Sequence, residues 1–346
     1  MKARTRIVAG ATLAGLLALG AADTARAARV DGPALHWNFA MYGPKRAVTF
    51  GFEELSRLLA AATDGKFKLE IHLGGTLAPE REMIDGLHLG AYEMTLVVSS
   101  FVPGKLPVTE GLGLPFLPQP STRHVRAVRD AFYAHPGPQR ELARWSASFV
   151  MPVPLGANEF VGKGKAPLTL DGWKGLRIRA LAGVAKTMRG FGAVAQNIPT
   201  SEVYGALDRG IIDAASASPY ALVAFKAHET TNWYTSNMNV SVGPSVIVGN
   251  TKAIEALPPQ YKALLVESAR LATDEYVKVI AIDDVKALEL FKTRGMTEVH
   301  YTQAQLSELG RAARPIWTEW VDEVTQKGYP GEELLQIMLT AAKDVK

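Results

Sequence analysis

Two arginines alternate with apolar residues in the segment GLRIRALAG, residues 175–183. Every second residue from Leu176 to Ala180 is apolar, which predicts a half-buried strand with Arg177 and Arg179 on the opposite face. The strand runs into small residues, which suits a strand end that opens onto a cleft. A guanidinium at such an end offers a planar fork of donors that matches a carboxylate. Arg179 is therefore either a solvated charge or an anion-binding group.

No motif for catalysis or metal binding accompanies these arginines. The chain has no cysteine, which excludes a thiol nucleophile and a cysteine zinc site. None of its seven histidines has the spacing of a metal-binding pair, and no GxSxG, SxxK or phosphate-loop motif occurs. We expect a protein that is not an enzyme and needs no cofactor or metal. An exported enzyme stays an alternative, with Glu159 as the only acid that we would nominate beside Arg179.

The first 27 residues have the order of a secretory signal peptide. Basic residues within the first six positions precede an apolar run up to Ala22, and residues 25–27 form a small-x-small cleavage site. Removing residues 1–27 lowers the net charge from +4 to about +1 and leaves no concentrated basic face for nucleic acid. No later apolar stretch reaches membrane-spanning length. We predict a periplasmic protein, cleaved after about Ala27, with no nucleic-acid partner.

Strand and helix patterns alternate along the rest of the chain and would position the arginines. One series runs from a strand at 67–73 to a strand at 92–100. A second series starts at Trp173, and two such strand–helix series predict two α/β lobes. After Pro258 and Pro259, no proline or glycine occurs until Gly295. A helix over 259–293 would be roughly 52 Å long at 1.5 Å per residue, long enough to run along both lobes.

Three motifs in order resemble the DctP-type solute-binding proteins of TRAP (tripartite ATP-independent periplasmic) transporters. Residues 72–117, from HLGGTLAPERE to GLPFL, resemble the first-lobe signature. GWKGLRIRA and TSEVYGALDRGIIDA, at 172–180 and 200–214, resemble the second-lobe signature. VGNTKAIEALPPQYKALL, at 248–265, is similar to the segment before the family's long helix. The resemblance covers essentially the whole mature chain.

The resemblance implies an α/β fold, a two-lobed periplasmic-binding-protein clamshell with crossing strands and a long helix spanning both lobes. Ligand would close the lobes by a hinge motion. We assign residues 28–155 and about 241–281 to lobe 1, and residues about 156–240 and 282–346 to lobe 2. The family also implies a small-molecule organic acid as ligand and the membrane permease subunits of a TRAP transporter as partners.

The resemblance gives a role to one of the two arginines. In the family, the last arginine of this strand forms a salt bridge with the ligand carboxylate, and Arg179 occupies that position. Such a pair contributes more in a closed, dry cleft than in water. Arg177 keeps the interpretation of a solvated strand charge.

Other polar contacts of the family's sialic-acid branch are missing. Its first-lobe glutamate falls on Val98, a second arginine near Glu159, an asparagine on Ala217 and an aromatic residue on Thr200. A dicarboxylate would need a second cationic side chain in the site, and none is evident at these positions. We therefore expect a monocarboxylate with an apolar or aromatic body, such as a hydroxy or keto acid. Glu159, if it lies near Arg179, would instead neutralise that charge.

The remaining site candidates fall into an aromatic and a polar group. Aromatic side chains would line the body of the ligand, and polar side chains would bind a hydroxyl or keto oxygen. The aromatic candidates are Tyr42, Phe101, Phe191 and Trp233. The polar candidates are Ser99, Asn158, Glu159, Ser216 and Ser218, with Thr200 and Ala217 at positions of family contacts. Two other functions stay open: a C4-dicarboxylate or sugar-acid receptor, and a ligand-sensing protein for a membrane kinase.

Overall fold

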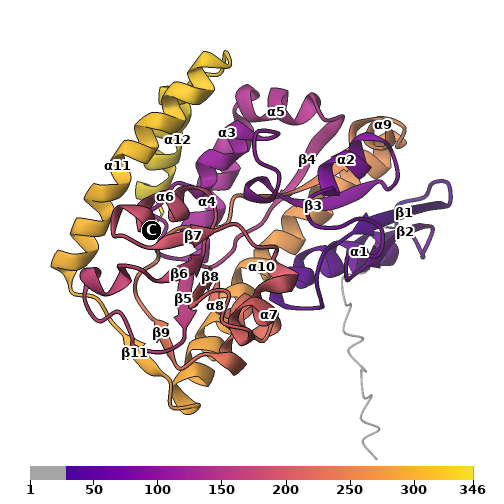
Figure 1. Cartoon of the computed structure of the whole chain (residues 1–346). Helices are drawn as coiled ribbons and strands as arrows, with labels where there is room; N and C mark the ends of the chain where they lie inside the picture. Colours follow the sequence, from indigo (N-terminus) through magenta and orange to yellow (C-terminus); the bar gives the residue numbers. More distant parts are fainter. Residues whose placement is uncertain (1–28, 346) are drawn as a thin grey trace, which may run out of the picture.

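The computed structural model describes residues 29–345, in which two mixed sheets form the centres of two lobes (Figure 1). The predicted signal peptide, residues 1–27, lies outside this part of the chain. The first sheet has the order β2 (Phe67–His72), β1 (Leu35–Ala40), β3 (Met94–Val98), β10 (Ser245–Asn250), β4 (Ala147–Pro152). The second has the order β11 (Thr297–Val299), β9 (Trp233–Thr235), β5 (Glu159–Gly162), β8 (Ala214–Ala217), β6 (Arg177–Arg179), β7 (Val194–Gln196).

Helices cover these sheets and connect their parallel strands. They are α1 (Phe50–Ala62), α2 (Met83–His88), α3 (Pro107–Glu110), α4 (Thr122–Ala134), α5 (Pro136–Ala143), α6 (Ala182–Gly190), α7 (Val203–Asp208), α8 (Pro219–Ala224), α9 (Thr251–Glu255), α10 (Pro259–Thr293), α11 (Gln303–Gln326) and α12 (Gly331–Lys343). The predicted α/β class is confirmed, and the predicted long helix is α10, with 35 residues.

Two of the crossings between the lobes end in strands of the central sheets. The chain leaves the first sheet after β4 and enters the second at β5, and it returns between β9 and β10. β10 runs antiparallel to both of its neighbours, β3 and β4, and β5 runs antiparallel to β8 and β9. Each of these crossings therefore ends in a strand that is hydrogen-bonded to a neighbour on both sides, and this pairing connects the two lobes.

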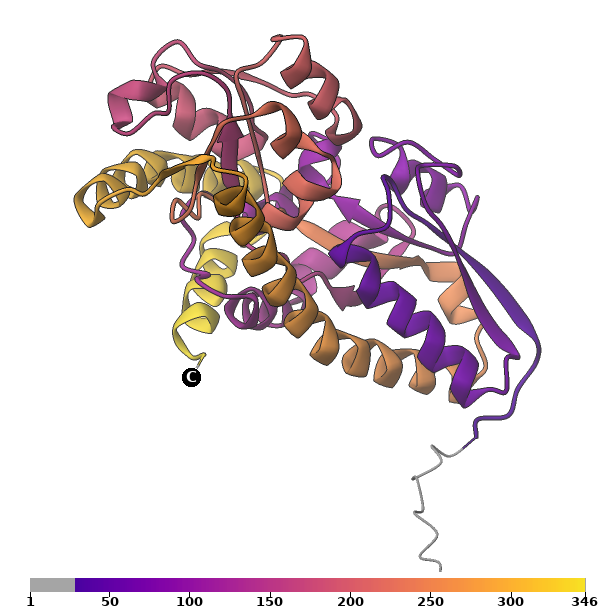
Figure 2. The same ribbon diagram turned by 90° about the horizontal axis from the view of Figure 1, so that it is seen from below.

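Helix α10 passes along both lobes (Figure 2). Its first half packs on α1, where the ring of Tyr276 lies over Gly51 and the Tyr276 hydroxyl donates to the Val48 carbonyl at 2.7 Å. Near its other end, Phe291 is fully buried in the core of the second lobe. The same helix thus contributes to the hydrophobic core of each lobe.

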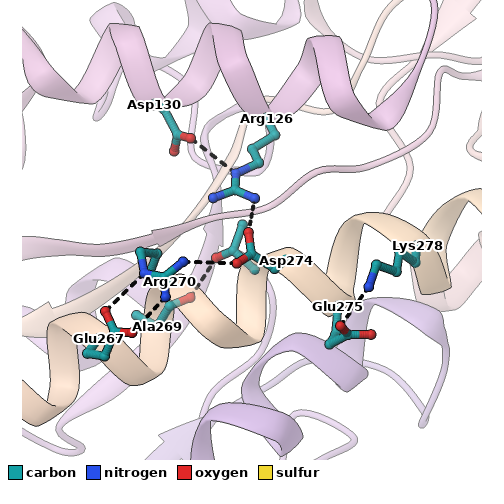
Figure 3. Close-up of polar contacts among 9 residues, drawn as sticks. Arg126, Asp130, Glu267, Ala269, Arg270, Asp274, Glu275 and Lys278 are labelled. Atoms are coloured by element: carbon teal, nitrogen blue, oxygen red, sulfur yellow. Dashed lines mark hydrogen bonds and ion pairs between the residues drawn. The ribbon is translucent and has the colours of Figure 1, made fainter.

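Ion pairs fasten α10 to α4 of the first lobe (Figure 3). Arg126 of α4 binds Asp274 of α10 and also Asp130, the latter at 3.2 Å. Asp274 accepts a second bond from Arg270 at 3.1 Å. Each pair is partly exposed and contributes little alone, but the shared carboxylate fixes the position of one helix against the other.

The last two helices pack differently from the predicted division at residue 282. The start of α11 lies with the second lobe, where Leu309 is buried. The indoles of Trp317 and Trp320 instead donate to the carbonyls of Pro115 and Pro107 in the first lobe, at 2.8 and 2.9 Å. Helix α12 packs on α4 and joins the same first-lobe core. We expected residues 282–346 in lobe 2, but the two tryptophans direct the end of the chain back to lobe 1.

Candidate functional site

One cavity lies between the lobes at the carboxyl ends of their parallel strands. Tyr42 follows β1 and Ser100 follows β3 in the first lobe, while Arg179 ends β6 and Ser218 follows β8 in the second. Ligands of open α/β sheets bind at this edge because the loops that follow the strands converge there. The sheet topology therefore brings residues more than a hundred positions apart into the lining of one cavity.

Arg179 is the central charged group of this cavity. Its side chain is buried, with 4% exposure. The guanidinium donates to the carbonyls of Ser216 and Ile198, at 2.8 and 3.1 Å, and to the hydroxyl of Thr200, at 3.1 Å. Within residues 29–345, no carboxylate lies within salt-bridge distance of it. Burial lowers the pKa of Arg179 to about 10, and the charge of nearby Glu80 opposes this shift, so the group stays charged at neutral pH without a salt bridge among these residues.

The hydroxyl of Ser216 is a second unsatisfied group beside Arg179. Its Oγ is buried and has no hydrogen-bond partner among the described residues. Ser216 also lines the cavity. A buried hydroxyl without a partner costs free energy unless water or a ligand supplies one. Among the described residues, the cavity lining thus includes an arginine without a salt bridge and a serine whose buried hydroxyl has no hydrogen-bond partner.

Aromatic and aliphatic side chains form the other walls. The rings of Tyr42 and Phe101 meet edge to face with centroids 5.4 Å apart. Val98, Tyr220 and Phe225 also line the space. The centre of a water molecule can occupy about 90 Å³ of the cavity, whereas one water needs roughly 10–15 Å³ by this measure. The cavity is thus several times larger than one water molecule requires, and it has room for a small organic molecule.

The structure brings most of the predicted site residues into this cavity. Those that line it are Tyr42, Phe101, Asn158, Arg179, Thr200, Ser216, Ala217 and Ser218. Arg177 lies on the exposed side and pairs with Asp213, with Nη2 2.5 Å from Oδ1, as its interpretation as a surface charge predicts. The cavity wall does not include four other candidates: Glu159, Trp233, Ser99 and Phe191.

Glu159 faces away from Arg179. Its carboxylate accepts hydrogen bonds from the Thr235 hydroxyl and from the backbone N–H groups of Met238 and Asn239. Burial raises the pKa of Glu159 to about 7, although these three hydrogen bonds favour the charged form. Glu159 therefore binds the segment after β9, in which the chain returns to the first lobe. The neutralisation of Arg179 by Glu159, which the sequence left open, is not seen.

The other three candidates belong to packed regions outside the cavity. Trp233 is fully buried in the second-lobe core, and its indole donates to the Lys163 carbonyl at 3.1 Å. Phe191 packs against the same core. The hydroxyl of Ser99 donates to Glu110 on the side of a neighbouring cavity. Burial raises the pKa of Glu110 to about 7.

Two charged residues of the first lobe that lie at the cleft were not among the candidates from the sequence. Arg46 lines the cavity from the first lobe. Glu80, also of the first lobe, accepts the backbone N–H of Thr200 across the cleft at 3.0 Å. Beside it, Arg81 donates to the Asn197 carbonyl at 3.3 Å. Glu80 belongs to the glutamate-rich helix start of the first-lobe motif, so this motif was a signal that could have found it. Arg46 lies in a loop that shows no sequence pattern.

The described residues offer neither a metal site nor a membrane span. Within residues 29–345, no three His, Asp or Glu side chains are grouped so that they could hold a metal ion. None of the helices there is both long and apolar enough to cross a bilayer.

Comparisons with known proteins point to one family. Residues 39–323 match the sequence model of the DctP family, bacterial extracellular solute-binding protein, family 7. The chain is 26% identical over 281 residues to the C4-dicarboxylate-binding periplasmic protein DctP of Rhodobacter capsulatus, covering 80% of each chain. It is also 26% identical over 307 residues to a monocarboxylate 2-oxoacid-binding periplasmic protein of Nostoc sp., covering 85% of this chain and 80% of that one.

A solved structure with the same fold comes from a marine metagenome. It is a TRAP solute-binding protein specific for aromatic acid ligands, in complex with metahydroxyphenylacetate. The TM-score is 0.79 at 20% identity, over 89% of this chain and 98% of that one. This likeness shows that the two chains share the two-lobed fold.

Proposed function

The chain belongs to the bacterial extracellular solute-binding proteins of family 7, the DctP family, and we propose that it is a periplasmic receptor that captures a monocarboxylate between its lobes and delivers it to a TRAP permease. TRAP solute-binding proteins of this fold bind organic acids. The identity of the acid, the delivery to a permease and the periplasmic location are parts of the proposal.

One observation carries the assignment: Arg179 is buried at the cavity without a carboxylate partner among residues 29–345. Its hydrogen-bond partners are neutral oxygens, which fix the guanidinium. A ligand carboxylate would supply a salt-bridge partner, and the burial of the guanidinium strengthens such a pair. The aromatic walls favour a ligand with an apolar or aromatic body.

A thermal-shift screen with mono- and dicarboxylates tests this function. A ligand that binds only the folded protein stabilises it by RT ln(1 + [L]/Kd), about 2.7 kcal/mol at a hundred times Kd. The melting temperature should therefore rise by several degrees with the correct acid. If no carboxylate in the panel shifts it, the proposed function is wrong.

Arg179→Ala should abolish this shift, because it removes the carboxylate-binding group. Arg177→Ala is the matched control, since Arg177 lies on the same strand but pairs with Asp213 at the surface. The control should keep the full shift with the same acid. Affinity retained in Arg179→Ala, measured by calorimetry, would contradict the role of Arg179.

A further inference from the structure

Arg46 is a second guanidinium in the wall of the cavity, placed on the opposite lobe from Arg179. It follows β1 and comes directly before the short helix Ala47–Thr49 that leads into α1. The side chain is half-buried. The cavity therefore has one arginine in each lobe, although the sequence showed only the one in the second lobe.

Aromatic rings and carbonyls hold this guanidinium in one orientation. Its carbon lies 4.8 Å from the ring centroid of Tyr42 and 5.1 Å from that of Phe225. Nη1 donates to the carbonyls of Tyr42 and Pro44, at 3.1 and 2.8 Å. Phe225 belongs to the segment between the two crossings, so the cation–π contact joins the lobes. A guanidinium fixed in this way is prepared to bind an acceptor in its plane.

The charge of Arg46 has no internal partner in the part of the chain that the structure describes. No carboxylate of residues 29–345 forms a salt bridge with it. The nearby acid Glu53 is already engaged by Lys45, at 2.8 Å, and by the hydroxyl of Thr49, at 2.7 Å. Only Nη1 donates to the described protein atoms, so Nε and Nη2 stay available.

The two arginines act on the same space. Burial raises the pKa of Tyr42, and the charges of Arg46 and Arg179 both oppose that rise. The Tyr42 phenol therefore lies within electrostatic range of both guanidinium groups. Tyr42, Arg46 and Arg179 also line the same cavity, so a ligand there can contact both arginines.

From this arrangement we propose that Arg46 is a specificity-determining residue that binds an acceptor oxygen at the end of the ligand remote from its carboxylate. The inference rests on the proposed function, in which Arg179 binds the carboxylate. The ligand is then an organic acid with a second oxygen in a hydroxyl or carbonyl group; a second carboxylate at this end would replace the monocarboxylate of the proposed function by a dicarboxylate and keep the role of Arg179. A plain hydrocarbon acid leaves Arg46 unpaired and binds more weakly.

Matched acids test the proposal by calorimetry on the mature chain. Benzoate is compared with 3-hydroxybenzoate and with benzene-1,3-dicarboxylate, and butyrate with glutarate. A hydrogen bond to a charged group discriminates by roughly tenfold or more. The wild-type protein should bind at least one oxygenated acid about tenfold more tightly than its plain partner. The hydroxyl and carboxyl probes also show which kind of second oxygen is recognised.

Arg46→Leu should remove this preference while changing the affinity for benzoate or butyrate by less than about threefold, since leucine keeps an apolar contact with both rings. Arg46→Lys should restore part of the preference, because it keeps the charge but lacks the planar fork. Lys45→Ala is the control, as Lys45 is exposed and paired with Glu53, and it should keep the full preference.

An unchanged preference in Arg46→Leu would overturn the inference, and so would a wild-type protein that does not distinguish the members of a pair. Both results are compatible with Arg179 as the carboxylate site. If no acid of either series binds to the wild-type protein, the proposed function itself fails, and with it the inference that depends on it.

Discussion

At the scale of single residues, Arg179 is held in position from both lobes. Thr200 accepts its Nη2 bond, and the backbone N–H of Thr200 is in turn bound by Glu80 from the opposite lobe. Burial raises the pKa of Glu80, and the positive charge of Arg179 opposes this rise. In its ionised form Glu80 places a negative charge close to Arg179, and that charge weakens the attraction of Arg179 for a ligand carboxylate.

Replacing Glu80 by glutamine should strengthen ligand binding. The amide oxygen still accepts the Thr200 N–H, but the negative charge beside the anion site is gone. Because burial raises the folded pKa of Glu80, Glu80 gains its proton more readily than a solvated glutamate, and wild-type affinity should increase as the pH is lowered. Calorimetry with the tightest monocarboxylate of the thermal-shift panel should show this increase in the wild type and a flat profile in Glu80→Gln.

Glu82→Gln serves as the control for this prediction, since Glu82 is exposed in the same loop. It should leave both the affinity and its pH dependence unchanged. A wild-type affinity that does not increase at lower pH would contradict the role given to Glu80.

The sequence was sufficient to place Arg179 but not its surroundings. The strand motif ends at Arg179, so its resemblance to the family motif fixed the position of this residue. The expectation for Glu159 depended on an alignment in a short strand, where neighbouring side chains point to opposite faces. Asn158 lines the cavity, whereas Glu159 points to Thr235. Arg46 could not be found because its partners, Tyr42 and Phe225, come together only in the folded protein.

At the scale of elements, most segments were predicted well, including the fully buried strand β3, but the two crossing strands were not located. Helix α10 has the predicted bounds because proline and glycine delimit it. The family resemblance implied crossing strands, but no sequence pattern located β5 and β10. Every residue of both strands is buried, so neither shows the alternation of a half-exposed strand.

The contact of α1 with α10 should be sensitive to a single methyl group. A Cβ at Gly51 would lie 2.4 Å from the ring of Tyr276, which is itself fixed by its bond to Val48. Gly51→Ala should therefore lower the free energy of unfolding by about 1–3 kcal/mol, as overpacking of a core does. Urea denaturation measures the change.

Gly310→Ala is the opposite case within α11. No atom lies within 4 Å of a Cβ at this position, so the substitution should raise the free energy of unfolding by about 0.5–1 kcal/mol through helix propensity alone. If both alanine variants had the same stability, the packing of α1 on α10 would not be as close as described.

At the scale of the whole molecule, buried acids link stability to pH. Burial raises the pKa values of Glu110, Glu141 and Glu159 to about 7 each, above the ordinary value of 4.5. Between these two values the folded protein binds more protons than the unfolded chain. The free energy of unfolding should therefore be highest at the acidic end of this window and fall as the pH rises from about 4.5 to about 7.

Glu110→Gln tests one part of this dependence. The amide resembles the protonated acid and keeps an oxygen that accepts from Ser100, which donates to Glu110 at 2.8 Å in the wild type. Urea denaturation at several pH values should give a shallower decline for the variant than for the wild type. Identical slopes would mean that Glu110 is ionised in the folded protein throughout this range.

The position of β10 also decides the order in which the lobes can be completed. β10 lies between β3 and β4 in the first sheet, yet it is made about a hundred residues after β4. Until synthesis passes residue 250, the first lobe has a gap in the middle of its sheet, and the long loop that closes it makes this step slow. The sheet of the second lobe, in contrast, lacks only its edge strand β11 at that point. The lobe that begins the chain is therefore the last to close its central strand pairing, and its maturation requires that most of the second lobe has already been made.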